Sequence, residues 1–148
     1  MKGNLNMHEI LSDEEYRKLP SLENADPLTL AEAIHDILYD KRGRNIKVLK
    51  VEDKSTITDY FVLCTGTSST QVRGLADEVE YKTSLRHLHP HSVEGRGNGS
   101  WIVLDYSNVI VHVFNREARD FYNLDKLYAS TSEVKIENNS EELQESDI

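Results

Sequence analysis

The feature that most constrains the fold of this chain is a continuous apolar run, Tyr60-Phe61-Val62-Leu63-Cys64, with polar residues on both sides. A run of this kind is typical of a β-strand that is buried on both of its faces. We therefore expect this strand to lie in the centre of a β-sheet, with the other elements arranged around it.

Local patterns place those other elements. Asp26-Pro27 marks the start of a helix, because aspartate caps free amides and proline suits the first helical position, and Gly43 supplies its stop. Gly66-Thr67-Ser68-Ser69 is a turn that leads from the central strand into a second helix. The expected helices cover about residues 27–41, 69–88 and 116–122, and the expected strands cover residues 45–51, 60–64, 100–105 and 109–114. The fold class is therefore α/β, with a mixed sheet of about five strands and flanking helices.

The chain has 148 residues, which is enough for one core of ordinary domain size. We assign residues 28–128 to a single domain and residues 1–27 to a flexible N-terminal arm. Residues 129–148 are polar, acidic and poor in aromatic side chains, so they cannot repay the entropy lost on ordering. We expect this last segment to be a disordered acidic tail.

Charge and composition disfavour several classes of function. The net charge is −9, but most of it lies in the two terminal segments, and the near-neutral body has no basic stripe that could track a phosphate backbone. Little direct nucleic-acid binding is expected. No apolar run approaches the ~18 residues needed to span a bilayer, so no membrane partner is expected. The N-terminus does not resemble a secretory signal, and a single cysteine cannot form an internal disulfide, which favours a cytoplasmic location.

The residues that could support catalysis do not form a convincing active site. The turn at Gly66 could hold a phosphate on helix amides, but it lacks the lysine of a Walker loop, and no pair of acids follows for two-metal chemistry. Cys64, His112 and Asp105 include the types of a nucleophile, a base and an orienting acid, yet Cys64 lies in the most apolar strand. The histidines that alternate around Pro90 lack further ligands at metal-like spacing; they are His87, His89 and His91. We expect no catalytic residue, no metal and no cofactor.

The hairpin of residues 100–114 is the most informative constellation. Alternation places Trp101, Val103 and Asp105 on one face of the first strand, and Ile102, Leu104 and Tyr106 on the other. One face is typical of a core. The other combines the only tryptophan with a carboxylate, which is also the composition of a protein-binding hot spot.

At this point the sequence resembles the ribosome silencing factor family, also called Iojap. Six stretches in the right order, spread over about residues 28–128, support the resemblance. They are Thr58-Asp59-Tyr60-Phe61-Val62, Gly66-Thr67-Ser68, Ala76-Asp77-Glu78-Val79-Glu80, Trp101-Ile102-Val103-Leu104-Asp105-Tyr106, Val111-His112-Val113-Phe114 and Arg119-Asp120-Phe121-Tyr122-Asn123-Leu124.

The resemblance implies a fold and a function. Members have a nucleotidyltransferase-like α/β domain without the catalytic acids, and they are not enzymes. They bind the large ribosomal subunit through large-subunit ribosomal protein number fourteen and sterically block joining of the small subunit when nutrients are scarce. Organellar relatives act in assembly of the large subunit.

Within the resembling stretches, aromatic and charged residues are the candidates for the partner-binding surface. They are Trp101, Asp105, Tyr106, His112, Arg119 and Tyr122. Two other classes of function stay open. One is a nucleotide-binding enzyme of nucleotidyltransferase fold that uses the Gly66-Thr67-Ser68 turn. The other is a homodimeric module, because a surface kept for a partner can self-associate in its absence.

Overall fold

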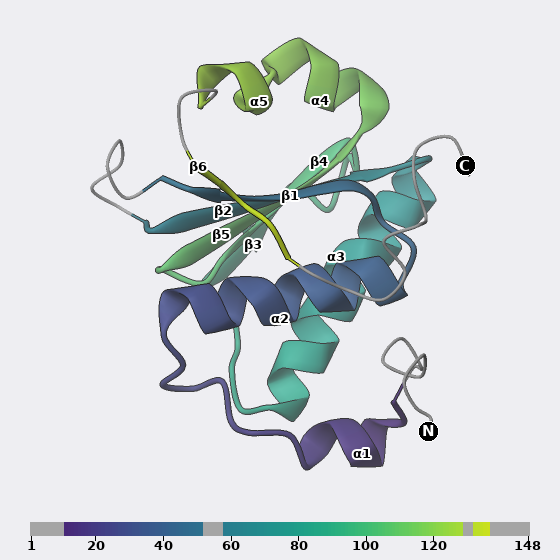
Figure 1. Cartoon of the computed structure of the whole chain (residues 1–148). Helices are drawn as coiled ribbons and strands as arrows, with labels where there is room; N and C mark the ends of the chain where they lie inside the picture. Colours follow the sequence, from purple (N-terminus) through teal and green to yellow (C-terminus); the bar gives the residue numbers. More distant parts are fainter. Residues whose placement is uncertain (1–10, 52–57, 129–131, 137–148) are drawn as a thin grey trace, which may run out of the picture.

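The computed structural model describes residues 11–51, 58–128 and 132–136, which form a mixed sheet of six strands with helices on both faces (Figure 1). The strands are β1 (Arg44–Lys50), β2 (Tyr60–Gly66), β3 (Ser92–Glu94), β4 (Trp101–Asp105), β5 (Val109–Asn115) and β6 (Ser132–Val134). Their order across the sheet is β3-β4-β5-β2-β1-β6. β2 and β5 are parallel, and the other neighbouring pairs are antiparallel. The expected α/β class and mixed sheet are confirmed, with β3 and β6 added to the strands placed from the sequence.

β2 lies in the middle of the sheet, between β1 and β5. Val62 and Cys64 belong to the larger core cluster, which includes residues of α2 (Pro27–Asp40) and α3 (Ser69–Leu85). Phe61 and Leu63 belong to a second cluster, which includes residues of α4 (Arg116–Tyr122) and α5 (Leu124–Leu127). Because side chains alternate between the two faces of a strand, a sheet covered on both faces requires apolar residues at every position of β2. The apolar run is therefore the central strand that the sequence predicted.

α2 begins as predicted, but the residue that takes the left-handed conformation after its end is not the predicted glycine. The Asp26 side chain accepts a hydrogen bond from the N–H of Thr29 at 3.1 Å, and a proline opens the helix. At the other end Arg42, not Gly43, takes the left-handed conformation, with φ of 71°. Gly43 is required for packing instead, because a Cβ at this position would collide with the sulfur of Cys64. The glycine thus allows the chain after α2 to approach β2.

The N-terminal segment is attached to the body from residue 11 onward, in contrast to the expected flexible arm. It forms α1 (Asp13–Arg17), which begins with a capping box between Ser12 and Glu15. Leu22 is 2% exposed and belongs to the larger core cluster, and its N–H donates to the carbonyl of Arg86 at 2.8 Å. Residues 1–10 lie outside the described residues.

The C-terminal segment contains a strand where disorder was expected. Residues 132–134 of β6 pair with Val48–Lys50 of β1. Val134 and Ile136 pack against the larger core cluster, and their apolar area provides the physical reason for ordering. Residues 132–136 of the predicted tail therefore join the sheet and its core, and residues 129–131 and 137–148 lie outside the described residues. Within the described ranges, no helix is both long and apolar enough to cross a membrane.

Candidate protein-binding surface

The two faces of β4 differ in burial. Ile102 and Leu104 are fully buried in the larger core cluster, whereas Trp101, Val103 and Asp105 are only half-buried. The latter three lie on the side of the sheet that carries α4 and α5. These helices are short, with 7 and 4 residues, and α4 packs on β5 and β2. The face of β4 beside them therefore remains partly open to solvent.

Three aromatic rings meet at this opening. The ring of Trp101 lies 4.5 Å from the ring of Tyr122, and the Tyr122 ring lies 5.0 Å from that of Phe121 in an edge-to-face contact. Phe121 is 79% exposed and Tyr122 is 52% exposed. We call these three residues the aromatic surface. Large apolar side chains gathered at the surface are typical of an interaction site.

Two asparagines fix where α4 begins and ends. Asn115, the last residue of β5, caps the helix by accepting the N–H of Ala118 at 2.8 Å. Asn123 ends it in the left-handed conformation, with φ of 50°. Asparagine tolerates this conformation better than most residues. The helix between the two asparagines turns Phe121 and Tyr122 toward solvent.

His112 lies directly behind Trp101. The indole Nε1–H of Trp101 donates to Nδ1 of His112 at 3.1 Å. The imidazole is 7% exposed and makes ring contacts with Phe61 at 4.7 Å and Phe114 at 5.9 Å. Burial lowers the pKa of His112 to about 4, so the ring is neutral at pH 7.

The hydrogen bond fixes the tautomer of His112. An indole N–H can only donate, so Nδ1 of His112 is the acceptor and the proton of the neutral ring sits on Nε2. This Nε2 is buried and has no hydrogen-bond partner among the described residues. A buried donor without a partner costs about 1–3 kcal/mol. His112 is thus a buried polar residue whose side-chain hydrogen bond supports Trp101.

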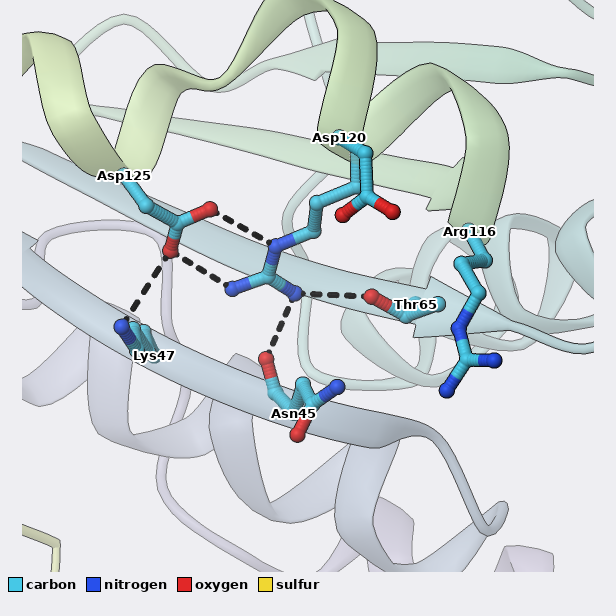
Figure 2. A pocket seen from close by; sticks show the side chains of 7 residues that line it. Asn45, Lys47, Thr65, Arg116, Asp120 and Asp125 are labelled. Carbon is cyan, nitrogen blue, oxygen red and sulfur yellow. Dashed lines mark hydrogen bonds and ion pairs between the residues drawn. The ribbon is translucent and has the colours of Figure 1, made fainter.

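Arg119 is buried and holds α4 and α5 against the sheet. Its guanidinium forms a bidentate pair with Asp125 at 2.9 and 3.0 Å, and it donates from one terminal nitrogen to the carbonyl of Asn45 at 2.6 Å and the hydroxyl of Thr65 at 2.9 Å (Figure 2). Asp125 also pairs with Lys47 at 3.3 Å. The hydrogen bonds from Arg119 lower the pKa of Asp125. Arg119 therefore lies behind the aromatic surface and fixes α4 and α5 to the sheet; we call Arg119 and its contacts with Asp125, Asn45 and Thr65 the brace.

Residues around this brace line a small cleft, seen from close by in Figure 2. Two further charged side chains of α4 border it, Arg116 and Asp120, and both are exposed. The guanidinium of Arg119 is already engaged on two sides by protein groups, so it is not free to bind an anion in this cleft.

The remaining two candidates lie apart from the aromatic surface. Tyr106 is 5% exposed on the opposite face of the sheet, and its hydroxyl is 2.8 Å from that of Thr83 on α3. Burial raises the pKa of Tyr106. Asp105 shares the face of Trp101 at the other end of β4, and its carboxylate accepts the N–H of Ser107 at 2.7 Å, which stabilises the hairpin turn.

The structure thus brings Trp101, His112 and Tyr122 together, sets Arg119 beneath α4, leaves Asp105 at the far end of the strand and places Tyr106 in the core. Sequence reasoning missed Phe121 and Leu127, which are 79% and 66% exposed. Both residues lie in short helices rich in charged side chains, where the apolar residues do not all fall on one helical face. This lack of periodicity is the signal that some of them stay exposed.

The turn before α3 is closed by its own side chains. The Gln71 side-chain oxygen accepts the backbone N–H and the hydroxyl of Thr67 at 2.5 and 2.9 Å, and Ser68 caps the N–H of Gln71 at 3.1 Å. These contacts occupy amides that a phosphate would need. The turn behaves as a helix cap, which does not favour the nucleotide-binding alternative.

The other chemical candidates do not assemble either. Cys64 points into the larger core cluster, whereas His112 points to the aromatic side of the sheet, so they do not share a site. Burial raises the pKa of the Cys64 thiol to about 12. Within residues 11–51, 58–128 and 132–136, no group of three or more histidine, cysteine or acidic side chains could hold a metal ion.

Comparisons with known proteins identify relatives of this chain. Residues 24–147 match the family described as "Ribosomal silencing factor during starvation". Ribosomal silencing factor RsfS of Haemophilus influenzae is 37% identical over 102 residues, which cover 69% of this chain and 100% of that protein. RsfS of Bacillus subtilis is 36% identical over 89 residues, which cover 60% of this chain and 75% of that protein.

Two further similarities concern an organellar protein and a solved fold. The mouse protein named "Mitochondrial assembly of ribosomal large subunit protein 1" is 29% identical over 102 residues, covering 65% of this chain and 43% of the mouse protein. The crystal structure of a protein from Chromobacterium violaceum has a TM-score of 0.68 at 24% identity, covering 77% of this chain and 94% of that one. The latter shows that the two proteins share a fold.

Proposed function

Because the chain belongs to the ribosomal silencing factor family, we propose that it binds the large ribosomal subunit and sterically blocks joining of the small subunit. In this proposal the contact on the large subunit is ribosomal protein number fourteen, and the outcome is repression of translation when nutrients are limiting. The site of action is the cytoplasm. The mechanism is occupancy of a surface, and no substrate is turned over.

The observation that supports this proposal most strongly is the aromatic surface. Trp101 and Tyr122 form one continuous contact between β4 and α4, and Phe121 stands beside them with 79% of its surface exposed. Aromatic side chains that lose this exposure on binding supply most of the energy of many protein interfaces. We propose that these three residues make the central contact with the partner.

Acidic side chains on the face of the sheet that carries Trp101 favour a partner with basic side chains. Asp105 pairs in register with Ser92 of β3, and Val103 pairs with Glu94, so both acids project from the face that carries Trp101. Acids at the rim of an interface improve register and association rate more than raw affinity. Asp105 lies on the same face of the sheet as Trp101 but at the other end of β4, and in this proposal it meets a lysine or arginine of the partner there.

The other candidate residues receive supporting roles in this proposal. His112 and Arg119 lie behind the aromatic surface and hold Trp101 and α4 in place. Tyr106 lies on the opposite face, where it joins the sheet to α3, so we assign it to the fold and not to the contact.

Sedimentation with purified large ribosomal subunits tests the proposal. We expect the wild-type chain to co-sediment and Trp101→Ala to lose about thirtyfold or more in affinity, as truncation of a hot-spot aromatic typically costs ~2 kcal/mol or more. Asp105→Arg should slow association. Undiminished binding by folded Trp101→Ala would contradict the assignment of the surface. Light scattering of the free chain shows whether a second copy occupies the same surface when the subunit is absent.

A further inference from the structure

The position of His112 needs an explanation beyond packing. Its imidazole is surrounded by the rings of Phe61, Phe114 and Trp101, at centroid distances of 4.7, 5.9 and 5.8 Å. An apolar side chain would suit such surroundings better, because the Nε2 of His112 is buried and has no partner among the described residues. The hydrogen bond from the indole of Trp101 to Nδ1 is the polar interaction that compensates for this cost.

The same bond determines which part of Trp101 can reach a partner. Trp101 is half-buried, and its polar Nε1–H points inward to His112. The remaining edge of the indole and the ring face toward Tyr122 consist of carbon and hydrogen atoms. A tryptophan held in this way presents apolar surface to a partner and does not require a hydrogen-bond acceptor there.

We infer that His112 is a positioning residue of the aromatic surface: its Nδ1 retains the indole N–H of Trp101 inside the fold, so that Trp101 offers the partner an apolar contact in one fixed ring orientation. This inference rests on the proposed function, in which Trp101 is a central contact. It also defines the chemistry of the partner at this point, which is aliphatic or aromatic carbon and not a carbonyl or carboxylate.

Two substitutions of nearly equal shape separate the hydrogen bond from packing. Asparagine places its Oδ1 where histidine has Nδ1, so His112→Asn keeps an acceptor for the indole, whereas His112→Leu removes it. We expect His112→Asn to bind large ribosomal subunits within about twofold of the wild type and His112→Leu to bind about fivefold to tenfold more weakly, which corresponds to the loss of one hydrogen bond. Circular dichroism checks that both variants are folded.

A double-mutant cycle shows whether the effect passes through the indole. Phenylalanine has no N–H to hold, so in a Trp101→Phe background the two His112 variants should bind equally. Equal weakening by both His112 variants in the presence of Trp101 would overturn the inference. A difference between them that persists in the Trp101→Phe background, where the indole donor is gone, would overturn it as well.

The indole resonance provides a readout that does not depend on the ribosome. Trp101 is the only tryptophan, so a ¹⁵N-labelled chain gives one indole N–H signal. We expect slow hydrogen exchange of this proton in the wild type and in His112→Asn, and exchange at least tenfold faster in His112→Leu. If the wild type and both variants are folded but none of them binds the large subunit, the proposed function fails. The exchange comparison still decides the role of His112, because equal exchange rates of the indole proton in all three proteins would overturn the positioning role.

Discussion

The ring of Trp101 on β4 lies 4.5 Å from the ring of Tyr122 at the end of α4. This contact joins β4 to α4, and the whole of β5 lies between these two elements in the sequence. Phe121 extends the contact outward, and His112 supports it from behind. The surface therefore depends on the placement of α4, which the buried Arg119 secures.

Replacing Phe121 by alanine should separate binding from stability. The side chain is 79% exposed, so its loss should change the free energy of unfolding by no more than about 0.5 kcal/mol. Affinity for the large subunit should fall about tenfold or more. Tyr81→Ala is the control, because Tyr81 is an aromatic residue of α3, 44% exposed, on the other side of the sheet. Equal effects of the two substitutions on binding would argue against the aromatic surface.

The loop before β4 provides a matched pair of glycines. Gly95 has φ of 98°, and a Cβ there would collide with the carbonyl oxygen of Trp101, whereas a Cβ on Gly97 would meet no atom within 4 Å. We expect Gly95→Ala to lower the free energy of unfolding by about 1–3 kcal/mol and Gly97→Ala to leave it within about 0.5 kcal/mol. Urea unfolding of both variants measures this. Equal stabilities would contradict the close approach of Gly95 to β4.

Removing the Arg119 guanidinium should destabilise the fold and not only the surface. Arg119→Ala leaves Asp125 without its bidentate partner, and we expect a loss of about 3 kcal/mol, at the lower end for a buried ion pair because Asp125 is partly exposed. Arg119→Lys should recover little of this, since an ammonium cannot make the paired contact. Arg116→Ala, an exposed neighbour on the same helix, is the control and should change stability by less than about 0.5 kcal/mol. A thermal or urea unfolding series that ranks the three variants differently would refute the brace.

His112 gives the stability of the chain a defined dependence on pH. The pKa of His112 is about 4 in the folded protein, against an ordinary value of 6.5. Between these values the unfolded chain takes up a proton that the folded chain does not, so stability that is complete above pH 6.5 is lost as pH falls toward 4.

Over this window we expect the wild type to lose about 3 kcal/mol more than His112→Phe, which has no imidazole to protonate. Urea unfolding of both proteins at pH 7, 6, 5 and 4 measures the difference. The carboxylates are common to the two proteins and cancel in the comparison. A stability difference that stays constant with pH would show that His112 does not titrate in this way.

Much of the fold could be predicted from the sequence because local signals and burial agree. The apolar run of β2 required cover on both faces, Asp26 and a proline opened α2, and strand alternation placed Trp101 and Ile102 on opposite faces. The resemblance to the silencing factor family is also confirmed by the family match over residues 24–147. The strand, the helix start and the alternation are each encoded within a few consecutive residues, whereas the resemblance depends on six stretches in order along the domain.

The short edge strands could not be predicted in this way. β3 and β6 have three residues each, and their extended conformation depends on pairing with β4 and β1, which are distant in sequence. The same holds for the attachment of the N-terminal segment through Leu22, because scattered apolar residues in a polar stretch do not reveal which core they enter.

The candidate site was predicted only in part for a similar reason. Arg119 is charged and lies in a short helix, so its burial depends on Asp125 and on the carbonyl of Asn45, which no local pattern shows. Phe121 and Tyr122 are adjacent, and a helix of 7 residues is too short for periodicity to tell which aromatic ring faces solvent. Tyr106 is different, since alternation along β4 already placed it with the core residues Ile102 and Leu104.

Subunit joining tests the central claim most directly. Purified large and small ribosomal subunits are mixed with the chain, and joining is followed by light scattering. The wild type should reduce the joined fraction in proportion to its occupancy of the large subunit, and a folded Trp101→Ala, Phe121→Ala double variant should leave joining unchanged at the same concentration. Normal joining in the presence of saturating, bound wild-type chain would contradict the account.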